Sequence, residues 1–213
     1  MKKKIFLAMV ALMFSSALFA VELDLKGGAM HPTPPNKFGL DTALAFNYDL
    51  NQYFLIGAEA GCGWVSWAGM GTGISHPYKD AYEPTFYRSH SADVYYVPAL
   101  LTLTAEVQYA ELIPYISGGA GYGWAWYRGY TANNVTNNDD KVKDKFSGFT
   151  WQILGGIKWK FKSSVLFITE MGFRRARTDN SRNVILDMTG WMGRVGICIP
   201  FGSTYSSTPS KTN

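Results

Sequence analysis

Seven ionisable residues lie on the small or polar face of segments whose other face is apolar, and their types and spacing could do chemistry. If the segments are β-strands, alternate side chains share a face, so all seven charges are expected to point the same way. Charges enclosed away from water must pair with each other or meet water. Two hypotheses fit, a gated polar pathway and a structural ion-pair network. We favour the network, because a narrow interior leaves room only for side chains. The seven are Asp41, Glu59, Glu106, Lys158, Glu170, Arg174 and Arg194.

The histidines offer a weaker candidate, a zinc site. Structural zinc sites use about four ligands at defined spacing. The potential ligands here are His76 and His90, with Asp80 and Glu83 between them, and no two of them have the close spacing of a zinc-binding pair. We therefore predict no metal site, and we expect these two histidines and His31 to lie in external loops.

A second weak candidate is Ser89-His90-Ser91, which is followed by Asp93. A serine nucleophile, a histidine base and an orienting carboxylate are the parts of a catalytic triad. Solvated loop residues are the commoner explanation, and we predict that the chain is not an enzyme. The glycine-rich stretches 69–73 and 118–123 lack the strand–turn–helix context of a phosphate-binding loop, so no cofactor is expected.

The N-terminus indicates export. Three lysines at 2–4 precede the apolar run 5–14, and small residues lead to a cleavage site after Ala20, which is the layout of a secretory signal peptide. Removing 1–20 takes away three of the 20 basic residues and none of the 16 acidic ones. The mature part is nearly neutral, so nucleic acid is not an expected partner. We expect a signal peptide at 1–20, one domain at 21–201 and a polar tail at 202–213.

Eight segments alternate with a period of two residues, which indicates β-strands. In one of them Leu40, Leu44 and Phe46 share a face, while Asp41 and Asn47 share the other. Beyond the leader, no run of 18 apolar residues predicts a transmembrane helix. The segments are 21–26, 38–48, 53–64, 93–109, 113–126, 149–161, 165–175 and 185–201.

The alternation is reversed relative to that of a soluble β-protein, in which the apolar face forms the core and the polar face meets water. The apolar face is rich in large aromatics, whereas the other face mixes glycine with charged residues. Most segments also reach the ~9–11 residues that a tilted strand needs to cross a membrane. The pattern predicts an all-β fold, an eight-stranded antiparallel up-and-down transmembrane barrel with a polar interior and an apolar exterior.

Connection lengths alternate as well. The links 49–52, 110–112 and 162–164 are short, and the links 30–37, 65–92, 127–148 and 176–184 are longer. Outer-membrane barrels have short periplasmic turns and longer external loops. We therefore expect the cell outer membrane as the location, with both mature termini in the periplasm and membrane lipid as a partner.

Aromatic residues gather near the expected strand ends, where amphipathic rings meet lipid headgroups. The predicted outer girdle is Trp64, Trp124, Trp126, Tyr127 and Trp151. The predicted inner girdle is Tyr48, Tyr53, Tyr109, Trp159, Phe161 and Phe201.

The longest predicted loop also carries aromatics, and external loops on a rigid scaffold are where binding usually resides. These side chains either contact host or extracellular ligands or pack over the barrel mouth. They are Trp67, Tyr78, Tyr82, Phe86 and Tyr87. Cys62 and Cys198 are expected on non-neighbouring strands at opposite ends of the wall, too far apart to form a disulfide.

Four stretches, 97–98, 114–124, 170–174 and 190–201, are similar to the small outer-membrane barrel superfamily that includes OmpA, OmpW and opacity-type proteins. The resemblance covers 21–201 and rests on glycine and aromatic patterns. It implies a surface-interaction or envelope-integrity role. The alternatives are a narrow OmpW-like conduit for small hydrophobic molecules and, more distantly, a lipid-modifying enzyme. It also implies that the outer-membrane assembly machinery reads a terminal aromatic; here a polar tail follows Phe201.

Overall fold

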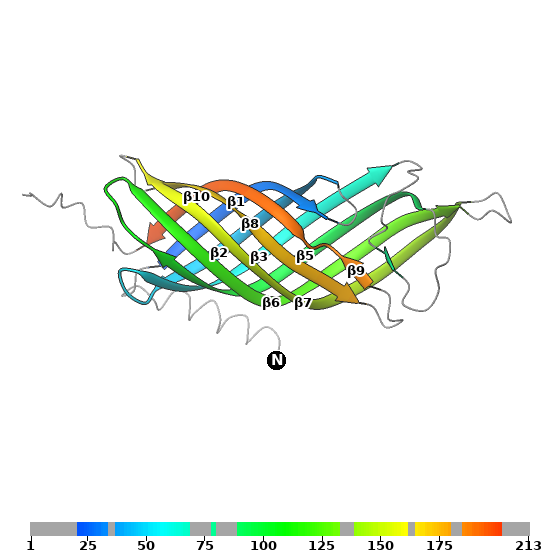
Figure 1. Cartoon of the computed structure of the whole chain (residues 1–213), viewed down its shortest axis with the longest axis horizontal. Helices are drawn as coiled ribbons and strands as arrows, with labels where there is room; N and C mark the ends of the chain where they lie inside the picture. Colours follow the sequence, from blue (N-terminus) through cyan, green and yellow to red (C-terminus); the bar gives the residue numbers. More distant parts are fainter. Residues whose placement is uncertain are drawn as a thin grey trace, which may run out of the picture.

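The computed structural model describes residues 21–33, 37–68, 78–79, 89–132, 139–161, 165–179 and 185–201. Long antiparallel strands form a closed barrel (Figure 1), and the expected eight-stranded, all-β architecture is confirmed. The eight long strands are β1 (Val21–Pro32), β2 (Gly39–Asp49), β3 (Phe54–Ala68), β5 (Ser89–Glu106), β6 (Leu112–Ala132), β7 (Asp139–Lys160), β8 (Leu166–Asp179) and β10 (Gly190–Phe201). Two short strands, β4 (Tyr78–Lys79) and β9 (Ile185–Asp187), pair with each other.

The barrel closes where β10 pairs with both β1 and β8. Register partners followed once around the wall from Val21 return to β1 at His31, ten residues further along. Such a stagger tilts the strands against the barrel axis, and eight tilted strands enclose an interior that side chains can fill. Within the described residues, the chain forms no helix long and apolar enough to cross a membrane.

The two ends of the barrel differ. The turn end, on the left of Figure 1, holds residues 21 and 201 and the connections 50–53, 107–111 and 161–165. In the first connection Asn51 Oδ1 accepts hydrogen bonds from the backbone N–H groups of Tyr53 and Phe54, at 2.8 and 3.0 Å. In the second, Ala110 has a φ of 52°. The loop end holds the connections after β1, β3, β6 and β8.

Several strands are longer than the sequence predicted. The predicted loop 127–148 is mostly strand, because β6 and β7 stay paired as far as Ala132 and Asp139. The predicted loops 30–37, 65–92 and 176–184 shrink in the same way, as β1, β3, β5 and β8 extend into them. The polar composition of these stretches suggested loops. A ladder that continues beyond the apolar band tolerates polar side chains on both faces, because both faces then meet water.

The last strand also departs from the prediction. Residues 185–201 form β9 and β10, which keep the same register on β8 across residues 188–189. There the N–H of Met188 donates to the carbonyl of Ala176 at 2.8 Å, and Thr189 Oγ1 accepts a hydrogen bond from the N–H of Ala176 at 3.2 Å.

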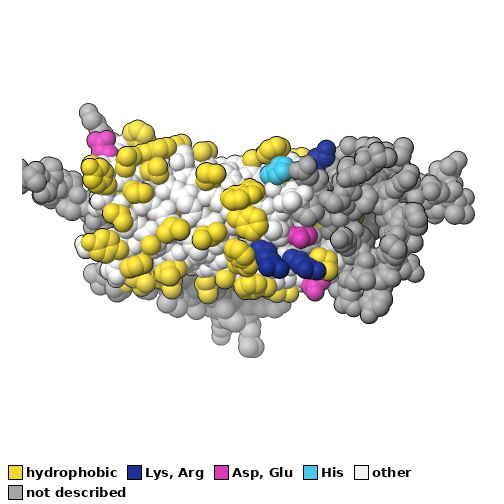
Figure 2. All heavy atoms as spheres, viewed as in Figure 1, with side chains coloured by type: hydrophobic (Ala, Val, Ile, Leu, Met, Phe, Trp, Pro, Cys, Tyr) yellow, Lys and Arg dark blue, Asp and Glu magenta, His cyan; other side chains and the backbone are white. Residues whose placement is uncertain are grey.

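The outer wall is apolar. On β2, Leu40 is 58% exposed, whereas its neighbour Asp41 is fully buried. On β5, Leu101 is 73% exposed between buried Leu100 and Thr102. Figure 2 shows apolar side chains along the wall, with charged side chains confined to its two ends. A wall of this kind is stable in lipid, and large exposed apolar surfaces mark membrane contact.

The interior has two halves. The half toward the loop end is an apolar cluster that includes Val65, Val94, Tyr127, Met30 and Met192. The half toward the turn end holds the charged side chains, beside a smaller apolar cluster of Ile113, Leu166, Ile168 and Cys198. The prediction of a polar interior was therefore correct for one half only. Val65 and Tyr127 fell in predicted loops, so their inward direction was missed.

Candidate functional site

Ten ionisable side chains are enclosed in the turn-end half of the barrel. Six are carboxylates and four are bases, so acids exceed bases by two. Strand alternation turns each of them inward, opposite the apolar residues on the wall. The set contains all seven residues named from the sequence and three more from β1. The ten are Glu22, Asp24, Lys26, Asp41, Glu59, Glu106, Lys158, Glu170, Arg174 and Arg194.

Arg194 is the centre of the network. Its guanidinium has no exposed surface and reaches carboxylates on three other strands. Nε lies 2.6 Å from Glu170 Oε1, and Nη1 lies 3.0 Å from Glu59 Oε1 and 3.4 Å from Asp41 Oδ2. A planar guanidinium presents several donors in a fixed fork. One side chain therefore ties β10 to β2, β3 and β8 across the interior.

Arg174 lies at the boundary between the ionic network and the apolar half of the interior. Its Nη1 donates to Asp41 Oδ1 at 2.9 Å, and its Nε and Nη2 donate to Gln152 Oε1 at 3.1 and 2.9 Å. The guanidinium also lies 5.9 Å from the ring centroid of Tyr96, a favourable cation–π arrangement. The hydroxyl of Tyr96 is hydrogen-bonded to Thr150 Oγ1 at 2.6 Å. Ionic and apolar halves are thus joined without a gap at this boundary.

Lys26 supplies the third base of the central group. Its Nζ lies 3.0 Å from Glu59 Oε2 and 3.4 Å from Glu170 Oε2. Glu170 Oε2 also accepts a hydrogen bond from the hydroxyl of Tyr115 at 2.5 Å. Glu59 and Glu170 therefore each bind two or more donors. Multiple donors are what a buried carboxylate needs to offset the loss of water.

Lys158 forms a second group nearer the turn end. Its Nζ lies 2.6 Å from Glu22 Oε2 and 2.8 Å from Glu106 Oε2. Asp24 lies between the two groups, with Oδ2 2.9 Å from Asn47 Nδ2 and 4.0 Å from Lys26 Nζ. Together with Asp24, the two groups occupy the interior from the turn end to the apolar half.

Packing inside the barrel is tight. A Cβ added to Gly123 would overlap Tyr96 Oη and lie 2.8 Å from Thr150 Oγ1. The cavity bordered by Asp24, Lys26 and Glu59 has a volume of about 10 Å³, room for about one water molecule. A solute cannot pass such a point without displacing paired charges. The arrangement is therefore suited to holding the barrel shut and its strands in register, and not to conduction.

Glu22, Asp24 and Lys26 were missed as members of the network. Their alternation with Val21, Leu23 and Leu25 had already placed them on the polar face. The short segment 21–26 gave no further reason to bring them together with residues on β3, β7 and β8. Alternation fixes a face, whereas partners depend on closure of the barrel.

Ten of the eleven predicted girdle residues face outward. Tyr127 does not: it is 5% exposed and belongs to the interior apolar cluster. Trp126 faces outward, so the next residue on the same strand must face inward. The outward-facing residues are Trp64, Trp124, Trp126 and Trp151 toward the loop end and Tyr48, Tyr53, Tyr109, Trp159, Phe161 and Phe201 toward the turn end.

Two of these rings have aromatic partners on the neighbouring strand. Trp159 stacks on Phe167 with ring centroids 5.5 Å apart, and Trp151 lies 6.0 Å from Phe173. Aromatic pairs across strands stabilise a sheet surface.

The loop-end candidates lie mostly outside the described residues. This holds for Tyr82, Phe86 and Tyr87, and for His76, Asp80 and Glu83 of the suggested zinc site. Trp67 belongs to β3 and Tyr78 to β4, and their side chains are not described. Ser89, His90 and Ser91 open β5, and their side chains are not described either.

Two histidine placements were wrong. His31 lies in β1 and His90 in β5, because both strands extend into the predicted loops. The ring of His31 lies 4.5 Å from that of Phe38, which is an ordinary packing contact.

The two cysteines are free, Cys62 exposed on β3 and Cys198 buried on β10. Cys198, Glu22 and Asp24 place one potential ligand atom each within 4.8 Å of one another. Glu22 is already paired with Lys158, and three ligands are one fewer than a structural zinc site uses. We assign no metal to these residues.

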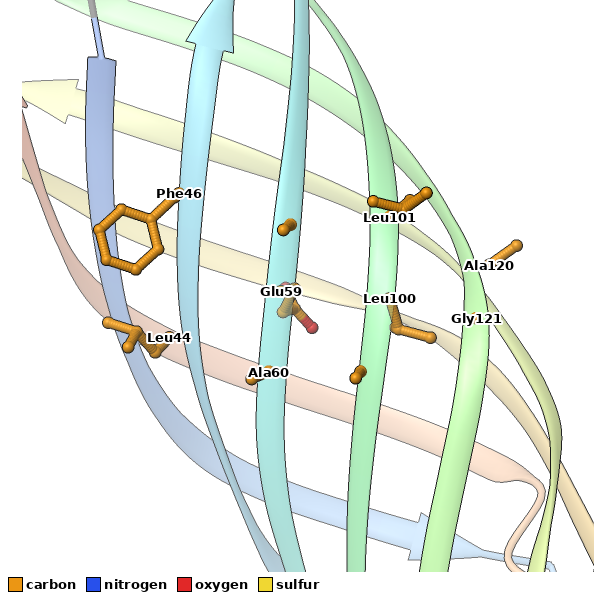
Figure 3. A pocket seen from close by; sticks show the side chains of 10 residues that line it. Leu44, Phe46, Glu59, Ala60, Leu100, Leu101, Ala120 and Gly121 are labelled. Carbon is orange, nitrogen blue, oxygen red and sulfur yellow. The ribbon is translucent and has the colours of Figure 1, made fainter. Parts of the chain in front are cut away.

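The outer wall carries a shallow apolar groove of about 410 Å³ between β2, β3, β5 and β6 (Figure 3). Alanines at 58, 60, 99 and 120 form its floor, and Leu44, Phe46 and Leu101 stand along its sides. Next to it, the pairing of β3 with β5 is interrupted between Ala60–Ala99 and Gly63–Tyr96. Pro98 lies in that gap and has no N–H to donate.

No family model matches the chain, and no curated protein matches it in sequence. Solved structures with a similar shape were found. Neisserial surface protein A (NspA) is 9% identical, with a TM-score of 0.49, over 85% of this chain and 96% of that one. The outer membrane protein OprG from Pseudomonas aeruginosa is 13% identical, with a TM-score of 0.49, over 87% and 97%. The N-terminal β-barrel domain of Pseudomonas aeruginosa OprF is 13% identical, with a TM-score of 0.45, over 85% and 97%. At these identities no residue's role transfers to this chain.

Proposed function

We propose that this chain is an integral outer-membrane protein whose barrel is a sealed scaffold. Its loop end then acts in surface contact or in the integrity of the envelope. The observation that carries the proposal is the contrast between the two faces of the wall. Leu101 is exposed on the outside, while Arg194 and Asp41 are completely buried inside. Apolar surface facing out and paired charge facing in suits a protein that is surrounded by lipid and does not conduct.

The ionic network supports the scaffold role. Arg194 alone contacts carboxylates from three strands, and the small cavity beside Asp24 leaves no room for a hydrated ion. The apolar cluster that includes Tyr127 fills the half of the interior toward the loop end. Function is then left to the loop end, in the way that binding residues on many rigid scaffolds sit on loops.

Planar-bilayer recording of the refolded mature chain tests the sealed scaffold. We expect no stepwise conductance, and Arg194→Met serves as a variant with a weakened interior. Steady single-channel currents from the unaltered chain would contradict the proposal. Heat-modifiable migration on gels, checked on the same samples, separates a folded silent barrel from an unfolded one.

Protease treatment of intact cells tests the orientation. With the loop end outside, we expect cuts in 69–88 and 133–138 and protection of the turn at 50–53. Cleavage at 50–53 with protection of both loop-end segments would reverse the orientation.

The alternative function is a narrow conduit that releases small hydrophobic molecules sideways into the membrane. The gap in β3–β5 pairing at Pro98 and the apolar groove beside it favour this alternative. The two ionic groups in the interior oppose it, because an apolar solute would have to pass paired charges. Uptake of a hydrophobic dye into vesicles that contain the refolded chain separates the two alternatives. A conduit would take up the dye, and the Pro98→Ala variant would take up less. A sealed scaffold would take up none. Lipid analysis after incubation of the refolded chain tests the more distant enzymatic alternative.

A further inference from the structure

Five basic side chains face outward near the loop end of three consecutive strands, and we call them the basic patch. All five are exposed. Within the described residues, none of them forms a salt bridge. The basic patch consists of Arg128 on β6, Lys143 and Lys145 on β7, and Arg175 and Arg177 on β8.

On each of these strands the outward positions change from basic to aromatic toward the middle of the barrel. Arg128 is followed by Trp126 on β6, and Arg175 is followed by Phe173 on β8. On β7 the change runs from Lys145 through a serine to Phe149. The basic patch therefore borders the apolar wall, as Figure 2 shows where dark-blue side chains meet the yellow ones near the loop end.

The side chains are close enough to act together. Arg128 and Lys143 are direct partners across β6 and β7, which places their Cβ atoms about 5 Å apart. Arg175 and Arg177 are same-face neighbours about 7 Å apart on one strand. Arg128 also lies over the ring of Tyr95, 5.8 Å from its centroid, which holds the guanidinium against the wall.

The basic patch is one-sided. Three acidic residues share this part of the wall with the five bases. Asp93 is the direct partner of Arg128 across β5 and β6, Asp187 is the direct partner of Arg177 across β8 and β9, and Asp179 lies two residues from Arg177. Strand β2 is diametrically opposite β7 in the order of the barrel, and among the described residues the one base beside its loop end is Lys37. Among the described residues the bases still exceed the acids on this side, and Lys143, Lys145 and Arg175 have no acidic register partner. This excess fits an anionic partner next to the membrane.

We propose that the basic patch binds the phosphate groups of lipids in the leaflet that surrounds the loop end. Guanidinium groups bind phosphate oxygens in a bidentate manner, and basic residues just outside the apolar band are attracted to anionic lipid. The band of aromatic rings directly beneath sets the depth at which lipid headgroups lie. The inference rests on the proposed membrane placement of the barrel.

The test uses the mature chain refolded in two vesicles, phosphatidylcholine alone and phosphatidylcholine containing bisphosphorylated lipid A. The variants are Arg175→Gln/Arg177→Gln and, as the matched control on the opposite wall, Lys37→Gln. We expect lipid A to raise the thermal unfolding midpoint of the unaltered chain, because a ligand of the folded state stabilises it. The double variant is expected to lose most of that rise and Lys37→Gln to keep it.

Dephosphorylated lipid A and inorganic phosphate complete the design. An equal rise with dephosphorylated lipid A would overturn the proposal, and so would an equal rise with inorganic phosphate in phosphatidylcholine vesicles. A double variant that keeps the full rise would overturn it as well. If the double variant does not fold, the lipid comparison on the unaltered chain still decides. Failure of the unaltered chain to insert into phosphatidylcholine vesicles would contradict the membrane placement instead, so the two failures are distinguishable.

Discussion

Arg194 and Glu59 are 135 residues apart in the chain, yet Arg194 Nη1 and Glu59 Oε1 meet at 3.0 Å inside the barrel. The two residues lie on β10 and β3, which are not neighbouring strands. Their contact therefore spans the interior and does not follow the wall. It depends on closure of the barrel and stabilises the closed form.

The excess of acids over bases makes the two partners unequal. Arg194→Met leaves three carboxylates with one base fewer, and we expect it to cost about 3–5 kcal/mol, as breaking a buried ion pair does. Glu59→Gln removes one of the surplus acids and keeps an amide for hydrogen bonding, so we expect about 1–3 kcal/mol. Urea unfolding in phospholipid vesicles measures both.

The double variant Arg194→Met/Glu59→Gln completes the cycle. We expect it to be less destabilised than the two single variants added together, because each change removes a partner of the other. Simple additivity, or a larger cost for Glu59→Gln than for Arg194→Met, would mean that the pair does not act as the structure indicates.

Gly123 is expected to be intolerant of a side chain. A Cβ there would overlap the hydroxyl of Tyr96 and lie 2.6 Å from its ring carbon Cε2. Overpacking of this kind costs about 1–3 kcal/mol, so Gly123→Ala should lower the unfolding free energy by that amount in the same assay.

Gly118→Ala is the matched control, since Gly118 lies on the same strand with nothing within 4 Å of the new atom. We expect it to be close to neutral. Adding Tyr96→Phe to Gly123→Ala should restore part of the loss, because the overlapping hydroxyl is then gone. Equal losses from the two alanine substitutions would refute the packing argument.

Much of the fold could be predicted because strand alternation is a local property. Leu40 and Asp41, or Leu101 and Thr102, face opposite ways for the same reason that their sequence neighbours do. The faces of Glu59, Glu170 and Arg194 followed in the same way, and so did the eight-stranded barrel.

Two features could not be predicted from the sequence. One is how far the strands stay paired beyond the apolar band, and the other is which side chains meet when the barrel closes. Tyr127 lies in a polar stretch that reads as a loop, although β6 continues through it. The partners of Lys26 come from β3 and β8, and no spacing within a single strand specifies them. The apolar half of the interior was hidden for the first of these reasons, since Val65 also lay in a predicted loop.

The lipid-facing wall makes a prediction that depends on depth. Leu101 is 73% exposed and lies midway between the outward-facing Tyr95 and Val107, whereas Tyr109 is 75% exposed at the turn end. An arginine on the lipid face costs about 2–4 kcal/mol at the bilayer midplane and about 0–1 kcal/mol near an interface. Leu101→Arg should therefore be much more destabilising than Tyr109→Arg when both are unfolded by urea in vesicles. If the two side chains faced water instead of lipid, both substitutions would have little effect on stability. Equal small effects would therefore contradict the membrane placement.

The turn between β5 and β6 holds a removable strain. Ala110 has a φ of 52° in the two-residue turn 110–111, which is closed by hydrogen bonds between Tyr109 and Leu112 at 2.8 and 2.9 Å. An L-residue in this left-handed region costs about 1–2 kcal/mol, whereas glycine adopts it freely. Glycine also adds about 0.5–1 kcal/mol of unfolded-state entropy. Ala110→Gly should therefore stabilise the barrel by about 0.5–1 kcal/mol, with faster refolding into vesicles if the turn forms early.

Ala110→Val provides the opposite change at the same position, because a β-branched residue tolerates a positive φ least. We expect it to be clearly destabilising, which sets the order Gly above Ala above Val in unfolding free energy. Ala110→Asn, which accepts the left-handed region without the extra entropy of glycine, should rank with or above glycine. A valine variant as stable as the alanine chain would show that the turn does not hold this conformation in the membrane.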